Sequence, residues 1–294
     1  MLAVTAAPGT IGHMNTQPII ALLTDFGLAD AYVGTMKGVT LSICRSARLV
    51  DLTHSIQPQN VRQAAYVLMT AFRHFPPDTI FLVVVDPGVG TERQPIAVET
   101  AHGVYVAPNN GVLSYVLPHV EVRHAVVLAE PRYQLPGPSM TFHGRDIFAP
   151  AAAHLAAGVP ITALGPTLPE LVKLDPPRLT IRGGSVEGEI IHIDHFGNII
   201  TSVGHLAWEG DNLILTPQFG AGGEPVRVAA DDVRVSIGGR TISGVQPTYG
   251  RAAPGTLLTL VGSSGQLEVG VNQGSAADEL GAALGDPVRV SFAE

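Results

Sequence analysis

Apolar strand-like segments alternate with segments of helical spacing through the first half of this 294-residue chain, and this alternation constrains the fold more than any other feature. The strand-like segments are IIALLTDF at 19–26, ARLVDLTH at 47–54 and TIFLVVVDPGVG at 79–90. Uninterrupted apolar strands separated by helices are typical of a parallel sheet whose two faces are both covered. We therefore predict an N-terminal α/β domain with a mainly parallel sheet.

Two helices are predicted between these strands, at 31–44 and 61–75. Their apolar sides are Val33, Met36, Val39 or Thr40, and Ile43 in the first, and Val61, Ala65, Leu68, Phe72 and Phe75 in the second. PIAVETAHGVYVAPNNG at 95–111 predicts a hairpin-like pair with Gly103 in its turn. DIFAPAAAHLAAGVP at 146–160 predicts another helix, which ends at Gly158 and Pro160.

The character of the sequence changes after about residue 165. A Pro-rich crossing, GPTLPELVKLDPPRLTIRGG, is followed by short alternating segments that turn residues separate, such as VEGEIIHIDHFGNIITSV and GTLLTLVGSSGQLEVGV. This pattern predicts an all-β antiparallel, barrel-like C-terminal domain. The expected organisation is a loose leader at 1–17, the α/β domain at 18–165, a linker at 166–184 and the β domain at 185–294. Met1 or Met14 is the start of translation.

Composition excludes several classes of partner. The net charge is −8 and no basic run occurs, so we expect no nucleic acid partner. No stretch approaches the roughly 20 apolar residues of a membrane span, and the N-terminus lacks the basic and apolar regions of a signal peptide. The single cysteine, Cys44, cannot form an internal disulfide, which favours a reducing, cytoplasmic location. Because Cys44 ends the apolar run GVTLSIC, we expect a buried structural thiol rather than a nucleophile.

The tripeptide D-F-G at 25–27 is also the magnesium-binding motif of protein kinases. The kinase interpretation fails, because no Gly-rich loop with a following V-A-I-K and no H-R-D loop is present. Asp25 remains as a carboxylate at the carboxyl end of the first strand, the edge where open α/β sheets bind ligands. It either accepts hydrogen bonds from ribose hydroxyls or caps the next turn, and we favour the first.

A second carboxylate, Asp86, ends the apolar strand in VVVDPGVGTER, and Arg93 follows seven residues later across a turn. The segment is not a phosphate-binding loop, because the Gly-Lys-Ser/Thr ending is missing. An Asp–Arg pair at a cleft is either a simple ion pair or part of a site. His143 in TFHGRDIFAP precedes a helix, and a lone histidine is more often structural; its spacing does not place it beside the pair.

IHIDHFGNIITS contains His192, Asp194 and His195, which together resemble a metal-ligand cluster. No H-E-x-x-H and no cysteine cluster accompany them, so we expect no metal site. F-G-N is the alternative: an aromatic ring that stacks on a base, a glycine for close approach and an amide that reads polar edges.

These stretches together resemble one family, the S-adenosyl-L-methionine (SAM) hydroxide adenosyltransferases, or SAM hydrolases, which are related to the SAM-dependent fluorinase and chlorinase. The motifs are LLTDFGLADAYVGTMKG, VVDPGVGTER, YVAPNNGVL, FHGRDIFAPAAAHLAAG and IDHFGNIITS, and the resemblance runs from about residue 18 to the C-terminus. It implies an α/β domain followed by a barrel-like β domain. It also implies a homotrimer with active sites at the subunit interfaces, each built from the N-terminal domain of one subunit and the C-terminal domain of the next.

The resemblance implies that water, acting as hydroxide, attacks C5′ of the SAM ribose and releases adenosine and L-methionine. No metal or other cofactor is implied. The catalytic set of the family matches Asp86, Arg93 and His143. Arg93 would stabilise the anionic water, His143 would hydrogen-bond or deprotonate it, and Asp86 would orient Arg93 and the water. The implied substrate contacts are Asp25 on the ribose, Asp30, Asp194 and Ser263 at the methionine end, Phe196, Asn198 and Asn272 at the adenine, and Asn109.

Departures from the fluorinase pattern bear on the alternatives. At the positions where the fluorinase binds halide, this chain has Asp86, Val89 and Gly144. The Asp86 carboxylate would repel an incoming halide. Gln59 replaces an aromatic lid residue, and Ser264 replaces an arginine near the methionine carboxylate. A SAM hydrolase is therefore the main hypothesis. A SAM-dependent halogenase and a non-catalytic SAM- or adenosine-binding sensor are the alternatives.

Overall fold

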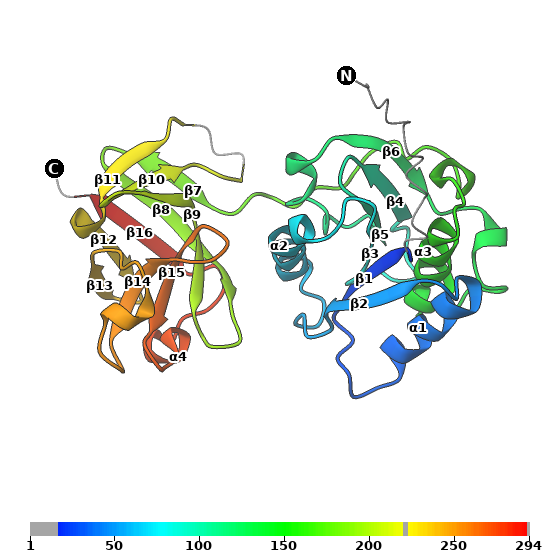
Figure 1. Ribbon diagram of the computed structural model, residues 1–294, viewed down its shortest axis with the longest axis horizontal. Helices are drawn as coiled ribbons and strands as arrows, with labels where there is room; N and C mark the ends of the chain where they lie inside the picture. The colour runs from blue at the N-terminus through cyan, green and yellow to red at the C-terminus, as the bar shows by residue number, and fades with distance from the viewer. Residues whose placement is uncertain (1–16, 220–222, 293–294) are drawn as a thin grey trace, which may run out of the picture. The chain divides into compact units, whose positions relative to one another are not determined.

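The structure, a computed structural model, describes residues 17–219 and 223–292. The expected leader at 1–17 lies outside the described residues except for Gln17. Contacts divide the chain into two units (Figure 1). The first comprises Met1–Val61, Ala71–Val112 and Leu117–Val172, and the second comprises Arg62–Thr70, Leu113–Val116 and Lys173–Glu294. The domain limits expected from the sequence, at 165 and 185, stay predictions.

A mixed six-stranded sheet forms the centre of the first unit, with strand order β2-β1-β3-β5-β4-β6 (Figure 1). The strands are β1 (Ile19–Thr24), β2 (Arg48–Thr53), β3 (Ile80–Val84), β4 (Pro95–Thr100), β5 (Val104–Pro108) and β6 (Val122–Val127). β2, β1, β3 and β5 are parallel neighbours, whereas β4 pairs antiparallel with both β5 and β6. The parallel core and the hairpin at 95–111 are confirmed. β6 was not predicted: it is an edge strand whose first three residues are exposed, so its apolar residues are confined to its second half.

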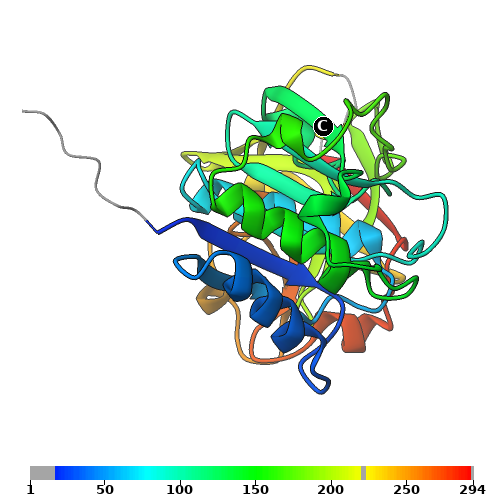
Figure 2. The same ribbon diagram turned by 90° about the vertical axis from the view of Figure 1, so that its right-hand side faces the viewer.

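The helices of the first unit begin and end close to the predicted residues. α1 (Tyr32–Ile43) buries Val33, Met36 and Thr40, as its spacing predicts. α3 (Ala149–Ala156) follows a single π-helical turn, Gly144–Phe148. α1 and α3 lie side by side over one face of the sheet (Figure 2), where they share one apolar core with the strands.

The opposite face of this sheet is buried as well. Phe81 on β3 stacks on Tyr105 on β5 with ring centroids 5.0 Å apart, and Phe75 packs edge-on against Phe81 at 5.6 Å. Phe75 follows α2 (Val61–Ala71) and a short 3₁₀ turn. Burial of both faces is what the uninterrupted apolar strands require.

The second unit is an antiparallel β structure. Its strands are β7 (Leu179–Arg182), β8 (Ser185–Ile193), β9 (Ile199–Glu209), β10 (Asn212–Thr216), β11 (Val226–Ala229), β12 (Val233–Ile237), β13 (Arg240–Ser243), β14 (Leu257–Val261), β15 (Gln266–Val271) and β16 (Pro287–Phe292). The main path is β11-β10-β9-β8-β16-β12-β13, with β7 on β8 and the β14–β15 hairpin on β9. One short helix, α4 (Ala276–Leu280), precedes β16. The predicted antiparallel fold is confirmed.

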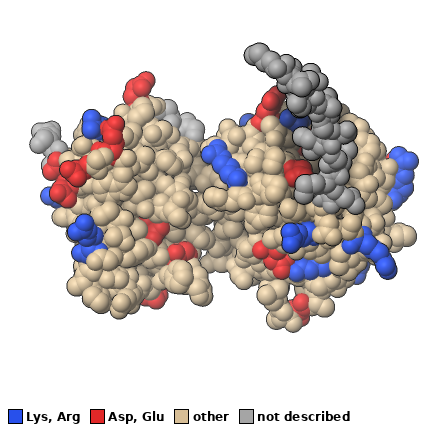
Figure 3. Space-filling model, in the orientation of Figure 1, with Lys and Arg blue, Asp and Glu red and all other residues tan. Residues whose placement is uncertain are grey.

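The expectation of a buried Cys44 is met. Cys44 is buried and free, with its Sγ 3.6 Å from Ser46 Oγ. In residues 17–219 and 223–292, no helix combines the length and hydropathy that crossing a membrane requires. On the face shown in Figure 3, basic and acidic side chains are interspersed rather than gathered by sign.

Candidate active site

The carboxyl ends of β1 and β3 form the edge on which the candidate site is built. From β1 the chain moves outward to β2 and then returns to β3 on the other side of β1, so the strand order reverses between β1 and β3. Thr24 lies opposite Val84 in the ladder, which places Asp25 and Asp86 just beyond the ends of neighbouring strands. Such a reversal point is where open α/β sheets bind ligands.

A tight turn folds Arg93 back toward Asp86. Thr91 stabilises this turn, because its Oγ1 donates to the Gly88 carbonyl at 2.7 Å and accepts from the Arg93 amide at 3.3 Å. Gly90 has φ +75°, and a Cβ there would lie 2.3 Å from the Met140 carbonyl oxygen. Only glycine allows this approach, which holds the turn against the segment that leads to His143.

The three residues that the family resemblance singled out come together directly. The Arg93 guanidinium forms a bidentate ion pair with the Asp86 carboxylate: Nε donates to Oδ1 at 3.0 Å and Nη2 donates to Oδ2. The same Nη2 lies 3.1 Å from His143 Nδ1. The side chains of Arg93 and Asp86 are only 7% and 5% exposed, so the pair is largely removed from water.

The hydrogen bonds fix the tautomer of His143. A guanidinium group only donates, so His143 Nδ1 accepts from Arg93 and carries no proton. Burial, followed by the positive charge of Arg93, holds the pKa of His143 below its ordinary value. Neutral His143 therefore carries its proton on Nε2 and presents a donor there.

Asp86 and Arg93 keep unused hydrogen-bonding capacity. Burial raises the pKa of the Asp86 carboxyl group above its ordinary value, even though Arg93 opposes this shift. Arg93 Nη1 is buried and, among the described residues, has no hydrogen-bond partner. The guanidinium also lies 5.3 Å from the Phe148 ring centroid, which fixes its plane. A buried donor without a partner next to a carboxylate is typical of a site that receives a polar ligand.

The π-helical turn after His143 is tightly packed. A Cβ on Gly144 would lie 3.2–3.4 Å from atoms of Met36, Phe142 and Phe26. The buried Asp146 carboxylate accepts from the Ser139 amide at 2.8 Å and from Arg145 Nε at 2.6 Å. Asp146 therefore fixes the segment before His143. Sequence reasoning missed this residue, and its signal was an acidic residue among the apolar residues of a predicted helix.

Asp25 is held by the loop before α2. Its Oδ2 accepts the Gln59 amide at 2.7 Å, and Gln59 has a left-handed φ of +67°. Behind it, the Thr24 hydroxyl lies 2.9 Å from His54 Nδ1 and accepts the Phe26 amide at 3.2 Å. This buried contact with His54, which the sequence did not predict, shapes the turn that carries Asp25.

The other predicted residues of the first unit are not in direct contact with the Asp86–Arg93–His143 set. Asp30 is exposed. The Asn109 amide is used within the protein, because Nδ2 donates to the Glu170 carbonyl at 3.0 Å and Oδ1 accepts the Val172 amide at 2.9 Å. Its neighbour Asn110 donates to the Val85 carbonyl at 2.9 Å, immediately before Asp86. Asn109 is thus hydrogen-bonded to the segment at 170–172, and Asn110 holds the backbone immediately before Asp86. A contact of Asn109 with the substrate stays a prediction.

Asp194 and Asn198 form one polar turn in the second unit. Asp194 Oδ1 accepts the backbone amides of Phe196 and Asn198 at 2.8 and 2.9 Å, and Oδ2 accepts Asn198 Nδ2 at 2.9 Å. The turn holds Phe196 at its tip, where the side chain is 73% exposed. Gly197 has φ +80°, and a Cβ there would lie 2.1 Å from Ser275 Oγ.

Ser263 and Asn272, the other two predicted residues of this unit, lie in separate loops. Ser263 is exposed between β14 and β15. Asn272 follows β15, and its Nδ2 donates to the Ala252 carbonyl at 2.7 Å. Sequence reasoning missed Tyr249 and Glu268, which hydrogen-bond to each other next to Asn198.

His192 does not join a metal site in the described residues. Its ring packs on Tyr66 with centroids 5.0 Å apart, and burial lowers its pKa. No group of three His, Cys, Asp or Glu side chains within 17–219 and 223–292 is arranged to hold a metal ion.

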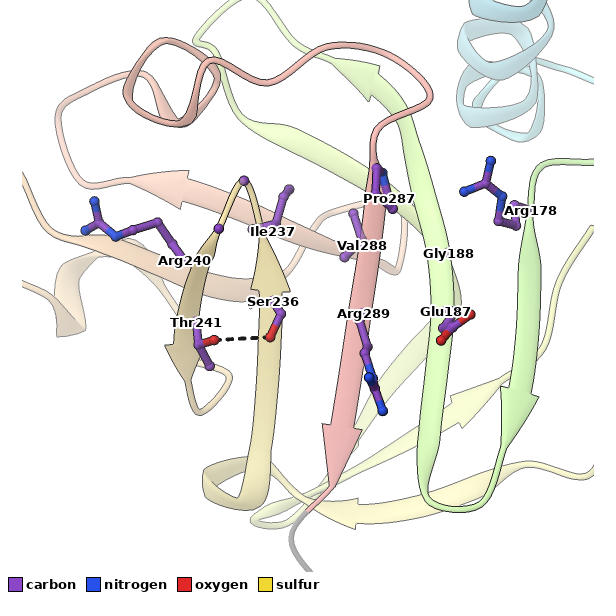
Figure 4. Close-up of a pocket in the computed structure, with 12 residues that line it drawn as sticks. Arg178, Glu187, Gly188, Ser236, Ile237, Arg240, Thr241, Pro287, Val288 and Arg289 are labelled. Atoms are coloured by element: carbon purple, nitrogen blue, oxygen red, sulfur yellow. Dashed lines mark hydrogen bonds between the residues drawn. The ribbon is translucent and has the colours of Figure 1, made fainter.

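A cavity of about 520 Å³ in the second unit contains none of the predicted site residues. Arg178, Arg240 and Arg289 contribute to its lining. Figure 4 shows their guanidinium groups at separate points around the cavity rather than converging on one position. The cavity therefore offers no second cluster of chemical groups.

Comparison with known proteins decides the family. The model of the SAM hydroxide adenosyltransferase N-terminal domain matches residues 20–165, and that of the C-terminal domain matches residues 188–289. The chain belongs to the SAM hydroxide adenosyltransferase family. The resemblance inferred from the motifs is thus confirmed.

Curated relatives and a solved structure of this family cover nearly all of the chain. The (R)-S-adenosyl-L-methionine hydrolase of Thermus thermophilus is 38% identical over 92% of this chain and 98% of its own length. The protein of the same name from Salinispora tropica is 39% identical, with 95% and 99% covered. A crystal structure of an uncharacterized conserved protein from Thermotoga maritima matches with a TM-score of 0.81 at 37% identity, with 92% of this chain and 99% of that chain covered. Fluorinases are more distant, as at 32% identity in Actinopolyspora mzabensis.

Proposed function

We propose that this protein hydrolyses S-adenosyl-L-methionine to adenosine and L-methionine, by in-line attack of an activated water at ribose C5′. The observation that carries this proposal is the Asp86–Arg93–His143 set, in which the Asp86 and Arg93 side chains are buried and Arg93 Nη1 has no partner among the described residues. The names of the curated relatives, (R)-S-adenosyl-L-methionine hydrolase, support it and point to the (R) epimer as the first substrate to test.

The chemistry of the substrate explains why so few groups suffice. Attack forms the bond between the water oxygen and C5′ and breaks the C5′–S bond, whose electron pair neutralises the sulfonium. Methionine is therefore a good leaving group, and neither a general acid nor a cofactor is needed. What the protein must supply is an aligned, partly desolvated nucleophile and stabilisation of the charge that develops on it.

We assign different tasks to the three residues, and their geometry supports this assignment. The two N–H bonds of Arg93 Nη1 are the donors left for the developing hydroxide, since Nε and Nη2 are used by Asp86 and His143. His143 donates from Nε2 and orients the water, because its Nδ1 already accepts from Arg93. Asp86 is the one anion of the set, and its raised pKa suits it to take the proton of the water and pass it to solvent.

The substrate-binding roles follow from the family. Asp25 binds the ribose hydroxyls with Oδ1, while Oδ2 stays on the Gln59 amide. Asp30, Asp194 and Ser263 bind the methionine end, and Phe196, Asn198 and Asn272 bind the adenine. Asn109 supports the site through the segment at 170–172. The exposed Phe196 ring supports an adenine-stacking role.

The remaining expectations are also proposals. We propose a cytoplasmic homotrimer with a barrel-like C-terminal domain, in which each site is completed by a neighbouring subunit. Three exposed apolar side chains of the first unit, Leu28, Tyr32 and Met140, support a covered surface there. Of these, Tyr32 packs on Phe26 and Phe142. Complementation tests the shared site: Arg93→Ala and Asn198→Ala chains, each impaired alone, should regain activity when dissociated and reassembled together. A fully active monomer, or a mixture no better than its parents, would rule out sharing.

Product analysis tests the function itself. The protein is incubated separately with the (R) and (S) epimers of SAM, with and without chloride and fluoride, and the products are separated by chromatography. Adenosine and L-methionine are expected in equal amounts, independent of halide. A 5′-halo-adenosine would identify a halogenase. Tight binding of unchanged SAM would identify a sensor.

A further inference from the structure

A half-buried tyrosine–glutamate pair lies next to Asn198 in the second unit. The Tyr249 hydroxyl donates to Glu268 Oε1, and the Asn198 amide interacts with the same hydroxyl. Glu268 comes from β15, whereas Tyr249 belongs to the 3₁₀ turn at Tyr249–Arg251. The two residues are 19 positions apart, so the pair is made by the fold rather than by local sequence.

Two glycines leave the room that this pair occupies. A Cβ on Gly270 would lie 2.6 Å from Tyr249 Cε1 and 3.0 Å from Asn198 Oδ1. A Cβ on Gly262 would lie 2.5 Å from Glu268 Oε2. The tyrosine, the glutamate and the amide are thus packed closely enough that none can turn without displacing its neighbours.

The contacts also settle the orientation of the Asn198 amide. The Asp194 carboxylate only accepts, so the atom 2.9 Å from its Oδ2 is the nitrogen of Asn198. The amide also interacts with the Tyr249 hydroxyl, which in turn donates to Glu268. Asn198 Oδ1 is left as an acceptor without a hydrogen-bond partner among the described residues.

The neighbouring charges keep the Tyr249 hydroxyl protonated, so that it remains a hydrogen-bond donor to Glu268. Burial raises the pKa of Tyr249, and the neighbouring Glu268 and Asp194 carboxyl groups raise it further, so the hydroxyl keeps its proton and remains the donor. Burial and the nearby Asp194 also raise the pKa of Glu268. Both carboxyl groups also raise the pKa of Tyr66, which lies in the same unit and whose pKa is raised mainly by burial.

We propose that Tyr249 and Glu268 are positioning residues that, with Asp194, lock the Asn198 amide with its oxygen as the available acceptor, and so select a 6-amino purine over a 6-oxo purine. This inference rests on the proposed function, in which Asn198 binds the adenine of SAM. A 6-amino group donates to an amide oxygen, whereas a 6-oxo group would place two acceptors against each other. A site built around such a hydrogen bond rejects the mismatched analogue strongly.

The test compares SAM with S-inosyl-L-methionine, its 6-oxo analogue, in the full-length protein. Tyr249→Phe removes the hydroxyl that holds the amide, and Glu268→Leu removes the acceptor of that hydroxyl. We expect KM for SAM to rise about 10-fold in both, with kcat within about 2-fold of wild type, because the reacting groups are untouched. The preference in kcat/KM for SAM over the inosyl analogue should fall about 10-fold or more.

Two further variants separate positioning from general damage. Glu268→Gln keeps an oxygen that accepts from Tyr249 and should retain most of the preference. Tyr105→Phe, which removes a buried hydroxyl bonded to the His102 carbonyl in the other unit, should leave the preference unchanged. Thermal unfolding of each variant shows whether it is folded, and if Glu268→Leu is not, Tyr249→Phe alone decides.

The outcomes distinguish this inference from the proposed function. Loss of preference in Tyr249→Phe with retention in Glu268→Gln supports the positioning role. An unchanged preference in Tyr249→Phe, or a wild-type protein that converts both analogues alike, overturns it while SAM hydrolysis stands. A wild-type protein that neither binds nor converts SAM refutes the proposed function, and the positioning role fails with it.

Discussion

Replacing Arg93 with methionine separates its two tasks, pairing with a buried carboxylate and stabilising the nucleophile. Methionine keeps an apolar stem next to Phe148 but removes the charge and all donors to Asp86 and His143. The Asp86 side chain is 5% exposed, so the variant leaves a buried carboxylate without its Arg93 partner. Breaking such a pair from one side costs about 3–5 kcal/mol of the free energy of unfolding.

The pH dependence of this loss has a definite sign. Burial already raises the pKa of Asp86 in the presence of Arg93, and removal of Arg93 removes a group that lowers it. The cost of the buried charge is therefore full above the folded-state pKa of Asp86 and is relieved as the pH falls and the carboxyl group takes up a proton. We expect the difference in stability between Arg93→Met and wild type to shrink as the pH is lowered.

The matched control is the double variant Arg93→Met/Asp86→Asn. It removes the stranded charge, so it should recover most of the lost stability but none of the lost turnover. In Arg93→Met, kcat should fall about 100- to 1000-fold, the usual effect of removing a donor to a developing anion. Urea unfolding and steady-state assays on the same preparations measure both. Wild-type stability in the single variant, or recovered turnover in the double variant, would refute the account.

Three other predictions follow from the site. Gly90→Ala should lower kcat about 10-fold or more, because a Cβ 2.3 Å from the Met140 carbonyl oxygen would push the Arg93 turn away from the segment leading to His143. Gly137→Ala is the kinetic control, because a Cβ at Gly137 would contact no atom within 4 Å. The acid limb of kcat/KM should show no inflection of His143 at or above pH 6.5, because burial and Arg93 lower its pKa; a limb at pH 7 that His143→Gln abolishes would contradict this. Extensive chelation, checked by elemental analysis, should leave activity unchanged, and recovery by one specific divalent ion would contradict it.

The elements that could be predicted from sequence are those whose burial leaves a clear pattern. β1 and β3 are buried on both faces and therefore read as apolar runs, and α1 buries one side at helical spacing. β6 is an edge strand with an exposed first half, so apolar residues occupy only its second half. The π-helical turn before α3 was predicted only as part of a helix, because its apolar spacing does not differ from that of the helix that follows.

Contacts in the candidate site likewise differ in whether the sequence predicts them. The seven-residue separation of Asp86 and Arg93 predicts that a turn brings them together, and it does. His143 lies 50 residues from Arg93, and only the family resemblance linked the two before the structure brought them together. The buried contact of Thr24 with His54 and the Tyr249–Glu268 pair were missed, because each joins residues from different elements whose types carry no pattern.

The central claim is that the Asp86–Arg93–His143 set activates a water that attacks C5′. The most direct measurement is a single-turnover reaction in ¹⁸O-labelled water, with the protein in excess over SAM. The adenosine is then analysed by mass spectrometry. We expect one ¹⁸O atom in every adenosine formed, at the 5′ oxygen, and formation of this product about 100- to 1000-fold more slowly in Arg93→Met. Adenosine that carries no label at the 5′ oxygen would contradict it.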